Sequence, residues 1–360
     1  MAKIFLTGAS GYIGGDVLYA LKSALPACQY TVLLRDEAKA QKLSQAYPDV
    51  QIVLGDLDAS STLEQQAREA DIVIREYPTS RHPLPLTNIG LFLLDTASSN
   101  HVKSAEAIAR GLTAVERPRP GHWLQISGAS VLSIPDIVAS AFGEPSDKVY
   151  SDVDGADELR GLIQQYSAKR VVDNLILSLT PAANRPKTAL IFPPIIYGRG
   201  RGPVNQRSIQ IPELARVTMQ RRGGIKVGKG EATWSNIHIS DVSSIFVKLA
   251  EKALRGEEGD LWNENGLYFP GTGAITFGSI SAQVAQEVKK LGLADSESVT
   301  EISHEEADSL TPHGGVLWGT NAQQVAQRAA KHLGWVPEGR TLEDEIPHTV
   351  LAEAQRLGLK

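Results

Sequence analysis

A glycine-rich motif near the start of the chain, Thr7-Gly8-Ala9-Ser10-Gly11-Tyr12-Ile13-Gly14, restricts the fold more than any other feature of this sequence. An apolar run at residues 4–6 precedes it, and a helical pattern with Ile13, Val17 and Leu21 on one face follows it. A buried strand that runs through such a turn into an amphipathic helix is the phosphate-binding unit of dinucleotide-binding proteins. The motif therefore predicts an α/β fold that begins with this unit.

Each glycine of the motif has its own expected role. Gly8 permits a tight turn, Gly11 lets the backbone approach a pyrophosphate, and Gly14 allows the helix to pack closely on the strand. Free amides at the start of the helix then bind the anion. The residues of the motif that we expect to bind a cofactor are Gly8, Ser10, Gly11, Tyr12, Ile13 and Gly14.

Short apolar runs alternate with helical patterns through the first half of the chain. The runs are residues 31–34, 52–54, 72–74, 124–126 and 188–192. Helical patterns lie between them, for example at 14–25 and 104–112. This alternation predicts an α/β fold of the Rossmann type, a doubly wound parallel sheet with helices on both faces.

The residue composition changes after Pro193, where a loop rich in glycine, proline and arginine begins. We expect residues 1–192 to form the dinucleotide-binding Rossmann domain. Residues 193–360 should form mainly a smaller C-terminal substrate-binding lobe, with some segments returning to the Rossmann core. In this part we expect a strand at 235–239 and helices at 279–291 and 321–333.

Residues 75–95 form an anomalous insertion between the fourth strand and its helix. Loops in such sheets usually have about 2 to 6 residues. One interpretation is a functional lid. Another is a translated intron, because Leu86-Thr87 can be encoded by CTA-AC, the core of a common branch site. Deleting the segment joins Ile74 to Thr96 and leaves an ordinary strand that ends in small residues, and transcript sequencing would distinguish the two interpretations.

The spacing of the three glycines resembles the short-chain dehydrogenase/reductase superfamily. Three further stretches extend the resemblance to its extended branch, the NAD-dependent epimerase/dehydratase group. They are Gly55-Asp56-Leu57-Asp58, Phe192-Pro193-Pro194-Ile195-Ile196-Tyr197-Gly198 and Ser235-Asn236-Ile237-His238-Ile239-Ser240-Asp241-Val242. The resemblance implies an enzyme, an NAD(P)-dependent oxidoreductase that transfers hydride between nicotinamide and a small carbonyl, alcohol or sugar-like substrate. It also implies that Asp56 and Leu57 flank the adenine ring and that Pro193 lies at the cofactor.

The end of the second strand determines which cofactor is expected. An acidic residue there bonds the ribose hydroxyls of NAD, whereas an arginine receives the 2′-phosphate of NADP. Arg35 is at the strand end, Asp36 follows directly, and Lys39 lies one turn later. Arg35 is placed like the basic residue of NADP-preferring relatives, including the more distantly similar NmrA-like group. We therefore expect NADP as the preferred cofactor, with NAD as the alternative.

The resemblance also suggests a catalytic set, although the match is imperfect. Ser127 or Ser130 follows the fifth strand, where the superfamily's reductases place a hydroxyl that orients the substrate carbonyl. Tyr166 is the candidate proton donor, and both Lys169 and Arg170 could share its helix face, with Arg170 as the register match. Tyr150 has no basic partner at helical spacing and is a poorer candidate.

The imperfect tyrosine motif keeps a second function open, a non-enzymatic NAD(P)-binding redox sensor of the NmrA-like type. Turnover of NADPH with a carbonyl panel would separate the sensor from the enzyme.

Composition narrows the setting in which either function would operate. Lysine and arginine are scattered and the net charge is −5, so we expect a small-molecule substrate and no nucleic acid. No run reaches the ~20 apolar residues of a bilayer span. One cysteine, Cys28, allows no intrachain disulfide, and we expect a cytoplasmic protein with no metal site. Many relatives pair through a four-helix interface, so the resemblance leaves a homodimer open.

Overall fold

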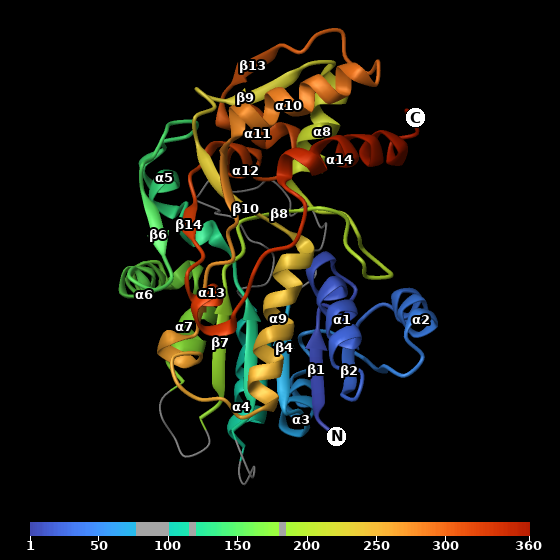
Figure 1. The fold of residues 1–360 in the computed structure, drawn as a ribbon, viewed down its shortest axis with the longest axis vertical. Helices are drawn as coiled ribbons and strands as arrows, with labels where there is room; N and C mark the ends of the chain where they lie inside the picture. The colour runs from blue at the N-terminus through green and yellow to red at the C-terminus, as the bar shows by residue number, and fades with distance from the viewer. Residues whose placement is uncertain (77–100, 115–119, 180–184) are drawn as a thin grey trace.

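A parallel sheet forms the centre of the molecule (Figure 1). The computed structural model describes residues 1–76, 101–114, 120–179 and 185–360. Within these ranges the sheet has seven strands, and all the neighbouring strands run parallel. In spatial order they are β11 (Leu267–Tyr268), β7 (Lys187–Ile191), β5 (His122–Ile126), β4 (Ile72–Arg75), β1 (Lys3–Thr7), β2 (Gln29–Leu34) and β3 (Gln51–Leu54). The order reverses between β1 and β4, and such a switch point at the carboxyl ends of strands is where ligands bind.

The central strands form because they are short, apolar and buried on both faces, whereas the edge strand β3 is partly exposed. Successive side chains point to opposite faces, so Ile4 and Leu6 belong to one hydrophobic core while Phe5 belongs to the other. The same alternation separates Leu124 from Trp123 on β5. Two cores therefore hold helices against the sheet from both sides.

Helices cover each face of the sheet. On one face lie α1 (Tyr12–Ala24), α2 (Glu37–Ala46), α9 (Ile239–Leu254) and α13 (Arg328–Leu333). On the other face lie α3 (Ser60–Glu69), α4 (Val102–Thr113), α6 (Ala156–Gln165) and α7 (Val171–Leu177). Figure 1 shows α9 lying across the sheet beside α1, although the two helices are far apart in the sequence. The expected Rossmann-type doubly wound sheet is confirmed.

A second group of elements lies beyond the carboxyl ends of the strands, at the top of Figure 1. Its helices are α5 (Ile134–Ala139), α8 (Gln210–Arg221), α10 (Phe277–Lys290), α11 (His304–Leu310), α12 (Gly314–Gly319) and α14 (Leu342–Arg356). Its small sheets join β8 (Ile195–Tyr197), β10 (Thr233–His238) and β12 (Gly273–Thr276), then β9 (Gly224–Val227) with β13 (Val299–Ile302), and β6 (Val149–Ser151) with β14 (Gln323–Val325). This group covers the edge of the sheet where the glycine motif ends.

Most elements fall where the sequence predicts them, including the strand at 235–239, which is part of β10. The helix expected over residues 321–333 is wrong in its first half. There the chain forms β14, because it pairs in parallel with β6, and only α13 is helical. Of the insertion at 75–95, residues 77–95 lie outside the described residues. Among the described ranges, none of the helices combines the length and apolar character that crossing a bilayer requires.

Candidate cofactor and active site

The glycine motif forms a turn between β1 and α1. Gly8 has a φ of 79°, which glycine adopts without strain, and the amide of Gly11 donates to the carbonyl of Gly8 at 2.7 Å. A Cβ on Gly14 would lie only 2.6 Å from that carbonyl oxygen, so a side chain has no room there. The turn presents the first amides of α1 at the carboxyl edge of the sheet, as an anion-binding site requires.

Side chains of α1 hold the loop that begins at Gly198 against the motif. The Tyr12 hydroxyl donates to the carbonyl of Gly198 at 2.7 Å. The fully buried Asp16 accepts from the backbone amide of Arg201 at 2.8 Å and from its guanidinium. Arg207, further along the loop, pairs with two glutamates. These two arginines therefore fix the loop and are not free cations for a ligand.

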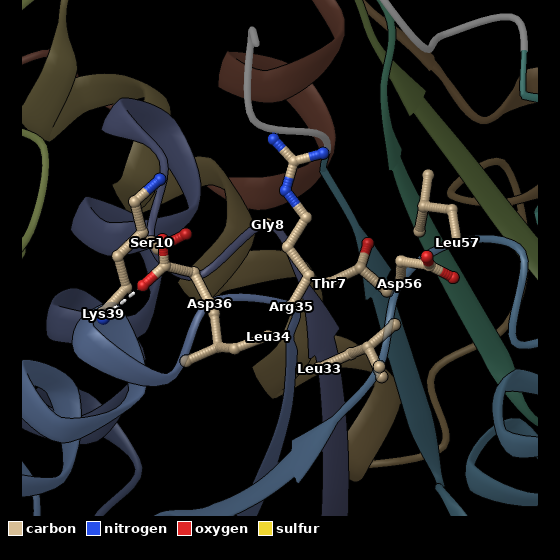
Figure 2. Close-up of a pocket in the computed structure, with 11 residues that line it drawn as sticks. Thr7, Gly8, Ser10, Leu33, Leu34, Arg35, Asp36, Lys39, Asp56 and Leu57 are labelled. Atoms are coloured by element: carbon tan, nitrogen blue, oxygen red, sulfur yellow. Dashed lines mark hydrogen bonds between the residues drawn. The ribbon is translucent and has the colours of Figure 1, made fainter.

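A pocket that is open to solvent lies between the glycine motif and the ends of β2 and β3 (Figure 2). Its lining residues are Thr7, Gly8, Ser10, Leu33, Leu34, Arg35, Asp36, Lys39, Gly55, Asp56 and Leu57. It therefore brings together five of the ten expected cofactor residues. The leucines give the pocket an apolar floor, and its rim is polar and charged.

The charged side chains on the rim of the pocket differ in whether they already form hydrogen bonds or ion pairs within the protein. Asp36 caps α2, since its Oδ1 accepts from the Lys39 amide at 2.9 Å, the dashed line in Figure 2. Arg35 is exposed, and neither its guanidinium nor the Lys39 ammonium has a hydrogen bond or ion pair with another described residue. The rim thus offers two cations without a partner among the described residues and two carboxylates, Asp36 and Asp56, each of which accepts one backbone amide.

Glu76 directly follows β4 and fills the space over the glycine motif. Its side chain is buried, and a Cβ on Gly11 would lie 3.1 Å from its Oε1. Burial raises the pKa of this carboxyl well above its usual range, although the amides of Gly14 and Ile13 lower it. An acidic group therefore stands where the first turn of such a helix binds a phosphate. The residues fit a dinucleotide only once Glu76 has moved away.

At the carboxyl edge of the central sheet, where the cofactor is expected, four buried side chains form a polar network. Ser127, directly after β5, donates to Asp173 Oδ2 at 2.8 Å. Arg170 Nη2 donates to Ser130 Oγ at 2.8 Å, and its Nη1 lies 3.7 Å from Asp173 Oδ2. The expected Ser127, Ser130 and Arg170 are thus brought together, and Asp173 is an addition that sequence reasoning did not single out. Pro193 is buried beside them, and its carbonyl accepts from the amide of Ala129 at 3.1 Å.

Tyr166 does not share a helix face with Arg170, contrary to the expectation. Helix α6 ends at Gln165, a 3₁₀ turn covers Ser167–Lys169, and α7 begins at Val171. The break turns Arg170 into the core, and no hydrogen bond to the Tyr166 hydroxyl occurs within the described residues. Lys169 stays largely at the surface. Tyr150 is buried on β6, where burial raises its pKa to about 12.

Two comparisons with curated proteins cover almost the whole chain. It is 35% identical over 365 residues, 99% of each chain, to the oxidase ucsJ of Acremonium sp.. It is 24% identical over 352 residues to an uncharacterized protein of Saccharomyces cerevisiae, which covers 96% of this chain and 97% of the yeast protein. No family model matches.

Solved structures with the same fold include two enzymes of sugar nucleotides. The dTDP-glucose 4,6-dehydratase of Streptomyces venezuelae, with NAD bound, has a TM-score of 0.63 at 13% identity and covers 98% of this chain and 97% of its own. The UDP-glucuronic acid 4-epimerase of Bacillus cereus has a TM-score of 0.58 at 14% identity, with 98% and 99% covered.

The chain has the fold of this dehydratase and this epimerase, the fold of the extended short-chain dehydrogenase/reductases that the motifs predicted. The chain belongs to the same family as the Acremonium oxidase.

Proposed function

We propose that this protein is an NAD(P)-dependent oxidoreductase that transfers hydride between nicotinamide and a small carbonyl, alcohol or sugar-like substrate. The observation that carries the proposal is the pocket between the glycine motif, Arg35 and Asp56, which has the composition of a site for the adenosine half of a dinucleotide. When bound, the nicotinamide supplies the hydride donor or acceptor, and the protein supplies orientation and a proton. The oxidase name of the 35% identical relative supports a redox reaction.

We further propose that NADP is preferred over NAD. Arg35 and Lys39 are cations on the pocket rim whose side chains have no partner within the described ranges, and a 2′-phosphate would supply an anion for them. Asp36 already uses one carboxylate oxygen to cap α2, which leaves it less able to bind two ribose hydroxyls. The sole cysteine, Cys28, supports a reducing compartment such as the cytoplasm.

The test has two stages. Binding of NADPH and NADH is measured first by fluorescence titration, with both cofactors at the same ionic strength. Consumption of the bound cofactor is then followed with a panel of aldehydes, ketones, alcohols and nucleotide sugars. Turnover with one class names the substrate class. Binding without turnover across the panel would favour the redox sensor instead.

A further inference from the structure

The Ser127–Asp173 pair is buried beside the cofactor edge of the sheet. Its place follows from the register, because Thr7 on β1 pairs with Arg75 on β4, which in turn pairs with Gln125 on β5. The residues that follow these three positions therefore emerge at one edge. Ser127 emerges there two residues after Gln125, with its amide bonded to the carbonyl of Ile191 at 2.8 Å. Ser127 thus lies at the carboxyl edge of the sheet, the edge at which we expect the cofactor.

The network leaves polar atoms unpaired. Asp173 is 2% exposed and Arg170 is 5% exposed. Asp173 Oδ1 and Arg170 Nε have no hydrogen-bond partner among the described residues. Buried side-chain polar atoms are seldom left in this state, and an orphan of this kind signals a bound water, an ion or a catalytic role.

A carboxyl in this environment is suited to exchanging protons. The pKa of Asp173 is raised above its usual value because the carboxyl is buried, and Arg170, Ser127 and Arg75 partly oppose this shift. A proton acceptor works best when its pKa lies near the working pH, which for a carboxyl requires an upward shift. Tyr166, in contrast, lacks a hydrogen bond to any member of the network in the described part of the chain.

We propose that Ser127 and Asp173 form the proton relay of the reaction, with Asp173 acting through Ser127 in place of a tyrosine. In the oxidative direction the O–H bond of the substrate alcohol breaks, and its proton goes to Ser127 Oγ. The Ser127 O–H bond breaks in the same step, and that proton goes to Asp173 Oδ2. The inference rests on the proposed function, in which the carbon-bound hydrogen leaves as hydride to an oxidised nicotinamide. Carbonyl reduction reverses each transfer.

The relay gives Arg170 and Ser130 supporting roles. Arg170 places a fixed cation 3.7 Å from the carboxylate, so the charged form of Asp173 is stabilised as it appears. Ser130 accepts from the other end of the guanidinium and holds its plane. Since arginine stays protonated, it cannot itself pass the proton on.

Four variants test the relay with the substrate found in the panel. Asp173→Asn and Ser127→Ala should each lower kcat by about 10²- to 10⁴-fold, the usual worth of a positioned acid–base group. The limb of the kcat–pH profile that reports Asp173 should vanish in Asp173→Asn, with KM changed much less than kcat. Ser127→Thr keeps the hydroxyl and should recover most of the activity. Tyr166→Phe should keep the wild-type profile.

Asp152→Asn is the matched control. Asp152 is also a fully buried aspartate whose pKa is raised by burial, but it accepts from the backbone amides of Phe269, Gln327 and Arg328. Its replacement should lower stability and leave the shape of the kcat–pH profile unchanged. The control thus separates a buried titrating carboxyl from one that belongs to the relay.

A second readout needs neither cofactor nor substrate. A carboxyl whose pKa is raised by folding contributes its full stabilisation at pH values below its unfolded pKa of about 3.9. This contribution is lost as the pH rises through the pKa of the folded state. The Tm difference between wild type and Asp173→Asn should therefore shrink as pH rises above about 4. A Tm difference that does not depend on pH would show that Asp173 does not exchange a proton, and this would overturn the relay.

The kinetic outcomes separate the relay from the function on which it rests. If the wild type turns over and Asp173→Asn keeps the same kcat–pH profile, the relay is overturned and the oxidoreductase function stands. Loss of activity in Tyr166→Phe would have the same meaning. Cofactor binding with no turnover in the wild type would instead overturn the oxidoreductase and the relay together.

Discussion

Replacing Glu76 by alanine should strengthen the binding of a nicotinamide dinucleotide to this chain. The Glu76 carboxyl is 5% exposed and lies against Gly11 and Gly14, over the first amides of α1. These amides are the groups that a pyrophosphate would need, so the carboxyl and the cofactor compete for one position. Glu76→Ala removes the competitor and adds no new side-chain volume near the glycines.

The size of the effect follows from what Glu76 gives up when it leaves. The amides of Ile13 and Gly14 both act on the carboxyl. A hydrogen bond contributes a net ~0.5 to 1.5 kcal/mol, and these two contacts are worth at most that much each, so they favour the occluded form by no more than about 3 kcal/mol. Since 1.4 kcal/mol corresponds to a tenfold change in affinity, the dissociation constant should fall by no more than about 150-fold. The burial of the carboxyl opposes occlusion and places the expectation below this upper limit.

The competition should also depend on pH. Burial raises the pKa of Glu76 in the occluded form, so that form takes up a proton that the open form releases. Rising pH, from the usual carboxyl pKa of about 4.3 upward, therefore penalises occlusion and tightens cofactor binding. Glu76→Gln has the same shape without the titration, and it should lose this dependence while still competing through its amide oxygen.

Fluorescence titration with NADPH over a series of pH values measures both effects. Equal affinity in the wild type and Glu76→Ala at every pH would refute the competition. A chain without residues 75–95, in which Ile74 joins Thr96, should bind at least as tightly as Glu76→Ala. Sequencing of transcripts across the segment then decides whether the shorter chain is the natural one. A deletion variant that does not fold would count against the translated-intron interpretation.

Four further substitutions test the rest of the site. Gly11→Val should abolish NADPH binding in a fluorescence titration, because a Cβ there already lies 3.0 Å from the Gly8 carbonyl oxygen, and unchanged affinity would remove the loop from the site. Arg35→Ala should weaken NADP(H) by ~1.5 to 3 kcal/mol, the value of a charge-assisted bond, and leave NAD(H) nearly unaffected; equal losses would show that Arg35 does not read the 2′-phosphate. Arg170→Ala should lower the free energy of unfolding in urea by about 3 to 5 kcal/mol, because it leaves Asp173 as an unpaired buried charge. Lys169→Ala, at the surface, should lower it by about 0.5 kcal/mol or less.

The sheet could be predicted from the sequence because its signals are local. Six of the seven strands are short apolar runs that can be recognised without knowledge of the rest of the fold. The two-residue strand β11 was not predicted, because its pairing with β7 is a tertiary contact. The glycine motif is equally local, since the turn and the helix start depend on residues within one segment. For this reason the cofactor half of the site, from Gly8 to Arg35 and Asp56, could be proposed residue by residue.

The proton-transfer half was harder to predict because it depends on how a helix breaks. The spacing of Tyr166 and Arg170 suggests one helix face, but the Asn174 side chain donates to the carbonyls of Ile163 and Arg170 and bridges two separate helices. Arg170 is then buried, and Asp173 becomes its partner. The one signal in the sequence was the Arg170-Val171-Val172-Asp173 spacing, which places an acid one turn after the arginine.

Strand β4 links the glycine motif, which the Glu76 side chain covers, to the proton-transfer network. Arg75, the last residue of that strand, is fully buried, donates to Gln125 Oε1 at 3.2 Å, and lowers the pKa of Asp173 by its charge. Glu76, the next residue, blocks the cofactor loop. A chain without residues 75–95 therefore loses both the competing carboxyl and a cation that favours ionised Asp173. Glu76→Ala changes only the first, so comparing the two chains separates cofactor access from the acidity of the relay.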